Sequence, residues 1–185
     1  MTDATIRFAA YVATLGRGPG RSRALTRDEA RDAFGMVLRG EADPHQVGAF
    51  LMLLRFRGED ADEITGLVEA ARAHVHRGGP EPGFADATGV DLDWPSYGAG
   101  RTRGAPWFLL AALALARSGI NVLMHGSNDF SSGIRVEAGL QALGLRPAES
   151  LAEALRMRPF AYLPLRALSA ELDRLLGLRA LFGLR

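Results

Sequence analysis

The stretch VDLDWPSYGAGRTR, residues 90–103, holds the residue types best suited to binding an anion. It reads as the end of a buried strand, Val90 and Leu92, followed by a loop and by a helix that begins at Pro106. A glycine-bearing loop between a strand and a helix N-terminus directs backbone N–H groups and the positive end of the helix dipole at a ligand. The candidate contacts from this loop are Ser96, Tyr97, Gly98, Gly100, Arg101 and Arg103. An ordinary turn with two solvated arginines explains the same residues equally well.

Charge is distributed by segment along the chain. All 22 basic residues are arginine, a bias that GC-rich coding also produces, and the formal net charge is +1. Residues 97–117 hold three arginines and no acid, and residues 1–25 hold four arginines against one acid. Residues 26–96 instead hold seven arginines against fourteen acids. This segmentation indicates a basic face that suits a polyanion, because the guanidinium fork matches phosphate.

Composition bounds the class of protein. A chain of 185 residues with 48% hydrophobic residues can bury a core. The absence of cysteine excludes disulfides and thiolate metal sites, in keeping with a reducing compartment. No apolar run reaches the ~18 residues of a membrane span, and we see no signal-peptide pattern. We therefore expect a cytoplasmic protein without a membrane partner.

Four helices are predicted in the first part of the chain, over residues 3–15, 27–39, 44–57 and 61–76. Thr26 and Glu29 have the spacing of a capping box, and Asp43 followed by Pro44 marks a second helix start. Apolar spacing predicts that Ile64, Leu67, Val68 and Ala71 of the last helix face inward. We expect a helical domain over residues 1–78 and a Gly/Pro linker over residues 79–89.

The remainder alternates strands with helices and predicts a parallel α/β domain over residues 90–185. The predicted strands are 90–92, 120–125 and 160–163, and the predicted helices are 106–118, 133–143, 151–157 and 165–176. Ligands bind such sheets beyond the carboxyl ends of the strands, where the loops after residues 92 and 125 emerge. The fold class is thus an α-helical bundle followed by an α/β domain.

Two parts of the chain resemble the anthranilate phosphoribosyltransferase family, glycosyltransferase family 3. The segments LTRDEA and LRGEADPHQVGAFLMLLRFRGEDADEITGL are very similar to its N-terminal helical domain, and HGSNDFSSG followed by EAGLQALG is similar to its His-Gly-Asn-Arg-x-x-Ser-Ser loop and next helix. The resemblance implies a nucleoside-phosphorylase-type α/β domain, incomplete here because family members are longer, and a homodimer through the N-terminal helices. It also implies further ligand contacts at His125, Gly126, Ser127, Asn128, Ser131 and Ser132.

The chain departs from the family where the family binds pyrophosphate. The Gly-Thr-Gly-Gly-Asp loop is replaced at residues 93–98 by Asp-Trp-Pro-Ser-Tyr-Gly, and the Asn-x-Ser-Thr segment falls on residues 106–109. The lysine before His-Gly is Met124, and the Asn-Arg pair is Ser127 and Asn128. Phosphoribosyl transfer needs fixed donors at its leaving group, and losing one typically lowers the rate ~10²-fold or more. We therefore expect no synthesis of phosphoribosyl anthranilate and assign no catalytic residue and no metal ligand.

The DWPSY loop instead resembles a paralogous TrpD-like branch, and this implies nucleic-acid binding through a basic groove. Arginines near Tyr97 and Trp107 suit phosphate contact with base stacking, although we expect Trp107 itself to pack on the sheet. Our first hypothesis is binding of a polyanion such as single-stranded DNA or RNA. The alternative is a glycosyl or phosphoribosyl transferase with an altered substrate, which would use a small-molecule phosphoribosyl donor and magnesium. A third possibility is that the chain is a truncated product.

Overall fold

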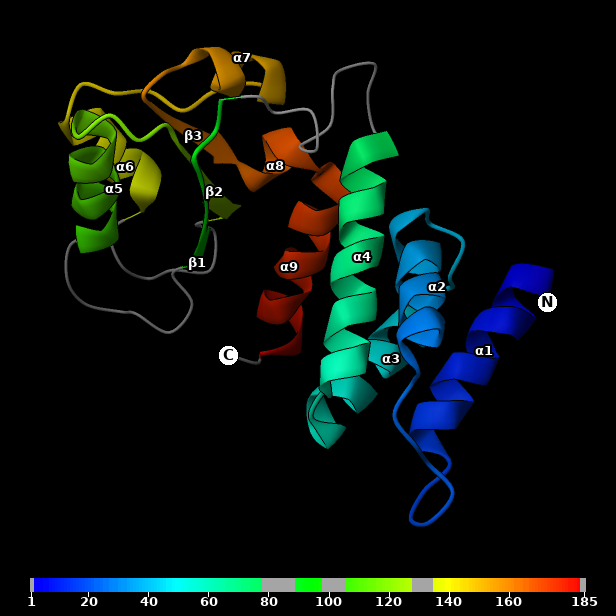
Figure 1. Cartoon of the computed structure of the whole chain (residues 1–185). Helices are drawn as coiled ribbons and strands as arrows, with labels where there is room; N and C mark the ends of the chain where they lie inside the picture. Colours follow the sequence, from blue (N-terminus) through cyan, green and yellow to red (C-terminus); the bar gives the residue numbers. More distant parts are fainter. Residues whose placement is uncertain (1, 78–88, 98–105, 128–134, 184–185) are drawn as a thin grey trace. The chain divides into compact units, whose positions relative to one another are not determined.

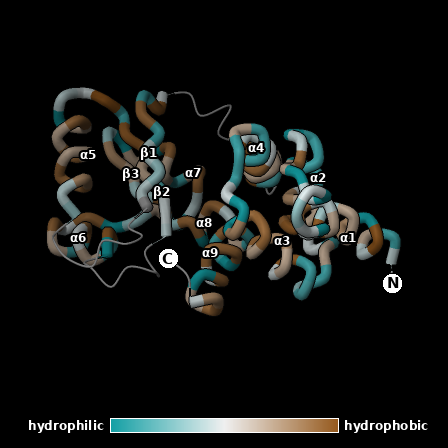
Figure 2. The backbone as a smooth tube through the Cα atoms, turned by 90° about the horizontal axis from the view of Figure 1, so that it is seen from below, coloured by the Kyte–Doolittle hydropathy of each residue, from teal (hydrophilic) through white to brown (hydrophobic). Residues whose placement is uncertain are grey.

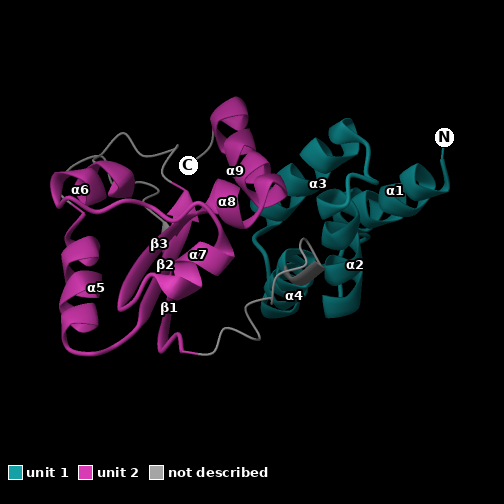
Figure 3. Cartoon of the chain, turned by 90° about the horizontal axis from the view of Figure 1, so that it is seen from above, with its two compact units in different colours: residues 1–77 teal, residues 78–185 magenta. Residues whose placement is uncertain are grey.

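The computed structural model describes residues 2–77, 89–97, 106–127 and 135–183 (Figure 1). The chain divides into two compact units, Met1–Arg77 and Gly78–Arg185, coloured separately in Figure 3. The hydropathy colouring of Figure 2 shows apolar and polar residues alternating around the helices of both units. No helix in the described ranges is long and apolar enough to span a membrane.

The first unit consists of four helices: α1 (Asp3–Gly16), α2 (Arg27–Leu38), α3 (Pro44–Arg57) and α4 (Ala61–Arg77). Its core contains Phe8, Leu25, Met36 and Phe50, all fully buried. The predicted caps are confirmed. The hydroxyl of Thr26 accepts a hydrogen bond from the Glu29 backbone, and the Glu29 carboxylate accepts one from the Thr26 backbone.

The inward face predicted for α4 is wrong in part. The side chains of Ile64 and Val68 are exposed, whereas Glu63 and Ala70 are buried. The cause is the close approach of α2 at Gly66, where an added Cβ would lie 2.3 Å from the carbonyl oxygen of Arg27. This contact brings Gly66 against α2 and leaves Ile64 and Val68 on the exposed side of α4. Apolar spacing alone cannot detect a crossing that depends on a missing side chain.

The second unit is built on a parallel sheet of three strands in the order β1-β2-β3. Helices α5 and α6 contribute to a core on one face with Met124 and Tyr162, and α7 and α8 contribute to a core on the other face with Leu123 and Leu163. The elements are β1 (Leu92–Tyr97), α5 (Trp107–Arg117), β2 (Val122–Ser127), α6 (Val136–Ala142), α7 (Leu151–Arg156), β3 (Phe160–Pro164), α8 (Leu165–Leu168) and α9 (Ala170–Phe182). This arrangement confirms the predicted fold class.

Several element boundaries differ from the sequence prediction. The strand expected at residues 120–125 runs from Val122 to Ser127. The strand expected at residues 90–92 runs from Leu92 to Tyr97, so Asp93–Tyr97 belongs to the strand and not to a loop. The edge position of β1 tolerates Pro95, because a strand edge leaves alternate N–H groups without a ladder partner. The helix expected at residues 165–176 is broken at Ser169, whose extended backbone (φ −158°) ends α8 and whose hydroxyl caps α9.

Candidate functional site

The sheet register places Asp93 of β1 and His125 of β2 on one face of the sheet. Paired residues in parallel strands share a face, as do alternate residues along one strand. Pro95 pairs with His125, and Asp93 pairs with Leu123. Asp93, Pro95 and His125 therefore lie on the face that carries Leu123 and, in the core beside it, residues of α7 and α8.

An imidazole and a carboxylate meet on this face. The Nε2 atom of His125 lies 2.9 Å from the Oδ1 atom of Asp93. The side chain of His125 is 18% exposed, and that of Asp93 is 56% exposed. In this geometry the Nε2–H donates to the carboxylate, which fixes the orientation of the ring. The site therefore joins a mostly buried histidine to a negative charge that remains in contact with solvent.

Gly126, next to His125, is required by the packing of β2 against β1. A Cβ on Gly126 would lie 2.0 Å from the carbonyl oxygen of Ser96 and 2.6 Å from its hydroxyl oxygen. No side chain fits in that space, so the position after His125 requires glycine in this fold. The close approach also places the carbonyl oxygen of Ser96, a hydrogen-bond acceptor, beside the carboxyl end of β2.

A buried tyrosine holds the same segment from β3. The hydroxyl of Tyr162 donates to the carbonyl oxygen of Gly126 over 3.1 Å, and the Tyr162 side chain is fully buried. The hydrogen bond satisfies a polar group that burial would otherwise leave unpaired, and it fixes the peptide plane between Gly126 and Ser127. Asp93, Ser96 and Tyr162 thus constrain the His-Gly-Ser segment through neighbouring strands.

The two tryptophans near the basic loop have different surroundings. Trp94 packs against the core formed with α5 and α6. Trp107, the first residue of α5, is 65% exposed, so the expectation that it packs on the sheet is wrong. The reason is its position in the first turn: Leu109 and Ala112 of α5 face the core, and Trp107 projects from another side of the helix. Pro106 supplies no side-chain cap to this turn.

Five of the predicted site residues fall within the described residues. Ser96 and Tyr97 are in β1, and His125, Gly126 and Ser127 are in β2, with Tyr97 paired to Ser127. The side chains of Ser96 and Ser127 are buried, at 8% and 9% exposed. The other predicted residues lie outside the described residues: Gly98, Gly100, Arg101, Arg103, Asn128, Ser131 and Ser132.

Sequence reasoning missed Asp93 as a site residue. The prediction placed it in a loop, where its side-chain direction is undefined. The signal that was present is the alternation of Leu92, Asp93, Trp94 and Pro95, which is typical of an edge strand with one apolar face. Extending the strand through this alternation would have placed Asp93 on the same face as its neighbour on β2.

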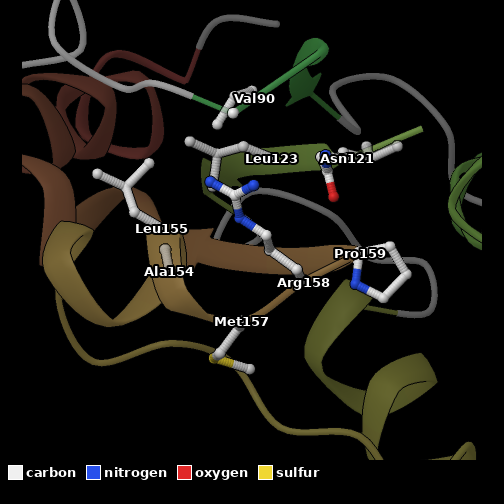
Figure 4. A pocket seen from close by; sticks show the side chains of 10 residues that line it. Val90, Asn121, Leu123, Ala154, Leu155, Met157, Arg158 and Pro159 are labelled. Carbon is white, nitrogen blue, oxygen red and sulfur yellow. The ribbon is translucent and has the colours of Figure 1, made fainter. Parts of the chain in front are cut away.

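The described residues leave a small cavity near the opposite, amino end of the sheet. A cavity of about 10 Å³ lies there between Val90, Asn121, Leu123 and Arg158 (Figure 4). That volume holds about one water molecule. Arg158 packs so closely on Gly89 that a Cβ at Gly89 would lie 2.0 Å from its Nη2 atom. This cavity therefore has no room for a substrate.

A larger groove of about 240 Å³ lies in the helical unit, between α2 and α4. Asp28, Arg31 and Arg39 are among its lining residues. Both arginines are held by carboxylates: Arg31 pairs with Asp28 at 2.7 Å, and Arg39 pairs with Glu41 at 2.6 Å. This groove is charge-compensated, and the described residues contain no group of three side chains able to hold a metal ion.

Comparisons with known proteins agree with this architecture. Residues 10–75 match the helical bundle domain of the glycosyl transferase family. The chain is 36% identical over 182 residues to an anthranilate phosphoribosyltransferase of Methylobacterium nodulans, covering 96% of the chain and 50% of that protein. It is 41% identical over 122 residues to the anthranilate phosphoribosyltransferase of Sinorhizobium medicae, covering 66% of the chain and 34% of that protein.

A solved structure extends the likeness to both units. The crystal structure of anthranilate phosphoribosyltransferase (TrpD) from Thermus thermophilus matches with a TM-score of 0.70 and 25% identity, over 97% of this chain and 51% of that one. The chain thus spans about half the length of these two longer matches. The helical bundle, the sequence identity along nearly the whole chain and the shared fold lead to one conclusion: the protein is a TrpD-like member of glycosyltransferase family 3.

Proposed function

We propose that this protein binds polyanions, single-stranded DNA or RNA, through the segment that joins β1 to α5. The observation that carries the proposal is the 65% exposure of Trp107 at the start of α5. A large exposed aromatic ring offers a stacking surface for a base, and stacking of this kind contributes about 1–3 kcal/mol per base. The two residues most suited to the phosphates, Arg101 and Arg103, precede it in the sequence within six residues.

The backbone of β1 supports the same proposal. Residues 93–97 form an extended strand paired with β2, and Pro95 has no N–H. A phosphate-binding turn instead directs successive N–H groups at one point. Without such a turn at this position, a pyrophosphate leaving group has few fixed donors there. Charged side chains of the following segment then provide the attraction to anions.

The alternative is a transferase that uses a phosphoribosyl donor and an altered acceptor. It is favoured by the likeness to anthranilate phosphoribosyltransferases and by the oriented imidazole of His125. A transferase of this kind would also need magnesium at its leaving group. The described residues place only Asp93 and His125 together on this face, and these pair with each other. They do not form a magnesium site by themselves, so we route no step through the metal.

We also propose a homodimer that forms through the N-terminal helices. Ile6 of α1 and Met52 and Phe56 of α3 are exposed at 55%, 41% and 88%. Exposed apolar side chains on helices that already contact each other suit an interface between two copies. Light scattering coupled to gel filtration should give twice the chain mass, and Phe56→Glu should shift it toward the monomer. A monomeric wild-type protein would contradict this part of the proposal.

Two binding measurements separate the two functions. Fluorescence anisotropy with a labelled single-stranded oligonucleotide at low salt should detect binding if the first proposal is correct. Calorimetry with phosphoribosyl pyrophosphate and magnesium should then give no heat. Absence of oligonucleotide binding at low salt, together with saturable heat from the phosphoribosyl donor, would reject polyanion binding in favour of the transferase.

A further inference from the structure

Asp93 places a negative charge directly beside the imidazole of His125 on the same face of the sheet. We propose that Asp93 is a specificity-determining residue that keeps compact phosphate anions away from His125. The segment after β1 then binds the anion, and the protein binds a long polyanion but not a free diphosphate. The inference deepens the proposed function and rests on it for the accepted ligand, while the rejection of diphosphate stands on the geometry of Asp93 alone.

The first step of the argument is the pairing of the imidazole. A histidine N–H is a good donor to a phosphate oxygen, and the bond is stronger when the ring is charged. In this protein the Nε2 atom already faces the Asp93 carboxylate at 2.9 Å. An anion would have to displace that carboxylate to reach the Nε2–H. Within the described ranges, the contact of Asp93 with His125 thus holds the nitrogen that an anion would need.

The second step is the exposure of the carboxylate. The Asp93 side chain is 56% exposed, so its charge is presented to solvent and not buried in the core. A small dianion or trianion that approaches His125 comes close to this charge. At separations well below the ~10 Å Debye length of 0.1 M salt, dissolved ions screen the repulsion between the two negative charges only weakly. Unfavourable like charges are a common means of rejecting a ligand that otherwise fits.

The third step is the chemistry of the neighbours of His125 on its own face of the sheet. In the register, His125 lies between Pro95 of β1 and Leu163 of β3. Neither side chain can donate a hydrogen bond, and Pro95 also lacks an N–H. An anion site requires converging donors. These two neighbours therefore do not help His125 to bind phosphate.

The test replaces Asp93 by asparagine, which removes the charge and retains the size. Isothermal titration with inorganic pyrophosphate, without metal, should show roughly tenfold tighter binding to Asp93→Asn than to the wild type, the scale expected for removing one close like charge in a solvated site. Glu149→Gln is the matched control, because Glu149 is an exposed acid in the segment before α7. It should bind pyrophosphate as the wild type does. Adding His125→Gln to Asp93→Asn should abolish most of the gain in pyrophosphate affinity. A merely structural role of Asp93 would not predict this dependence on His125.

Oligonucleotide binding, measured on the same variants, separates this inference from the proposed function. Asp93→Asn should change oligonucleotide affinity by less than about threefold, because the polymer contacts are made elsewhere. If oligonucleotide binds and Asp93→Asn takes pyrophosphate no more tightly than the wild type, the inference is wrong and the proposed function stands. If no protein binds oligonucleotide and Asp93→Asn still gains pyrophosphate, the role of Asp93 stands without the polyanion. Asp93→Thr, which suits a strand, replaces Asp93→Asn should the latter unfold.

Discussion

Gly126 of β2 lies so close to Ser96 of β1 that a single added carbon atom would come within 2.0 Å of the Ser96 carbonyl oxygen. The two strands are therefore locked together at their carboxyl ends, next to His125. The hydrogen bond from Tyr162 to the Gly126 carbonyl fixes the same peptide from the other neighbouring strand. The segment that holds the candidate site is rigid because backbone atoms of one strand occupy the space of side chains on the next.

Gly126→Ala should destabilise the protein by about 1–3 kcal/mol, because overpacking against a backbone atom forces the strands apart. Gly177→Ala is the matched control. Gly177 lies within α9 with nothing within 4 Å of its added Cβ, so alanine there should stabilise by about 0.5–1 kcal/mol. Urea unfolding followed by circular dichroism measures both. Equal unfolding midpoints for Gly126→Ala and the wild type would show that the strands are not locked at this point.

Glu63 of α4 is a buried acid with a structural role. Its side chain is 1% exposed and accepts hydrogen bonds from the backbone of Leu25, at 2.8 Å, and of Asp60, at 3.1 Å. Glu63→Ala should lower the free energy of unfolding by about 2–3 kcal/mol, because the Leu25 N–H loses its partner in the core. The neighbouring exposed acid provides the comparison: Asp62→Ala should cost less than about 1 kcal/mol. Similar losses for the two variants would contradict the assigned role.

Acid should weaken the start of α2 through Glu29. The hydrogen bond from the Arg23 side chain is the main cause that lowers the pKa of Glu29 from 4.5 to about 2, and a hydrogen bond from the Thr26 backbone lowers it further. A carboxyl whose folded pKa is depressed stabilises the fold above its unfolded pKa, and that contribution is lost as the pH falls from about 4.5 to about 2. Glu29→Gln should be less stable than the wild type by about 1 kcal/mol at pH 7, after allowance for solvent screening. Thermal melts should show this difference disappearing near pH 2, and an unchanged difference there would reject the assignment.

The helical unit was predictable from the sequence because its signals are local. Thr26 with Glu29, and Asp43 with Pro44, set helix starts through contacts within three residues, and both sets of contacts are present. The exposure of Ile64 and Val68 was not predictable, because it depends on how closely α2 approaches Gly66. Local patterns therefore gave the elements, and long-range packing decided their faces.

The site was harder to predict than the fold. The parallel sheet follows from alternating strands and helices, but the extent of β1 was underestimated because Pro95 and Ser96 are typical of loops. That error concealed the pairing of Asp93 with His125, which are 32 positions apart and meet only through the sheet register. The resemblance to the family supplied His125, but the carboxylate that contacts it is seen only in the structure.

Stacking on Trp107 should be measurable separately from charge. Trp107→Ala should weaken oligonucleotide binding by roughly tenfold, the factor expected from losing about 1–2 kcal/mol of base stacking. Leu181→Ala removes another exposed apolar side chain, 78% exposed, from α9 and should leave the affinity unchanged. Anisotropy titrations at one salt concentration compare the two variants. Equal losses for both would indicate nonspecific adhesion to exposed apolar side chains.

The most direct test of polyanion binding is its dependence on salt. Affinity for a single-stranded oligonucleotide should fall linearly on a logarithmic plot against salt concentration, with a slope of about −0.7 for each phosphate contact. Replacing both Arg101 and Arg103 by alanine should weaken binding and flatten that slope by one to two contacts, roughly 0.7–1.4. No binding at low salt, or an identical slope for the wild type and the double variant, would contradict the account.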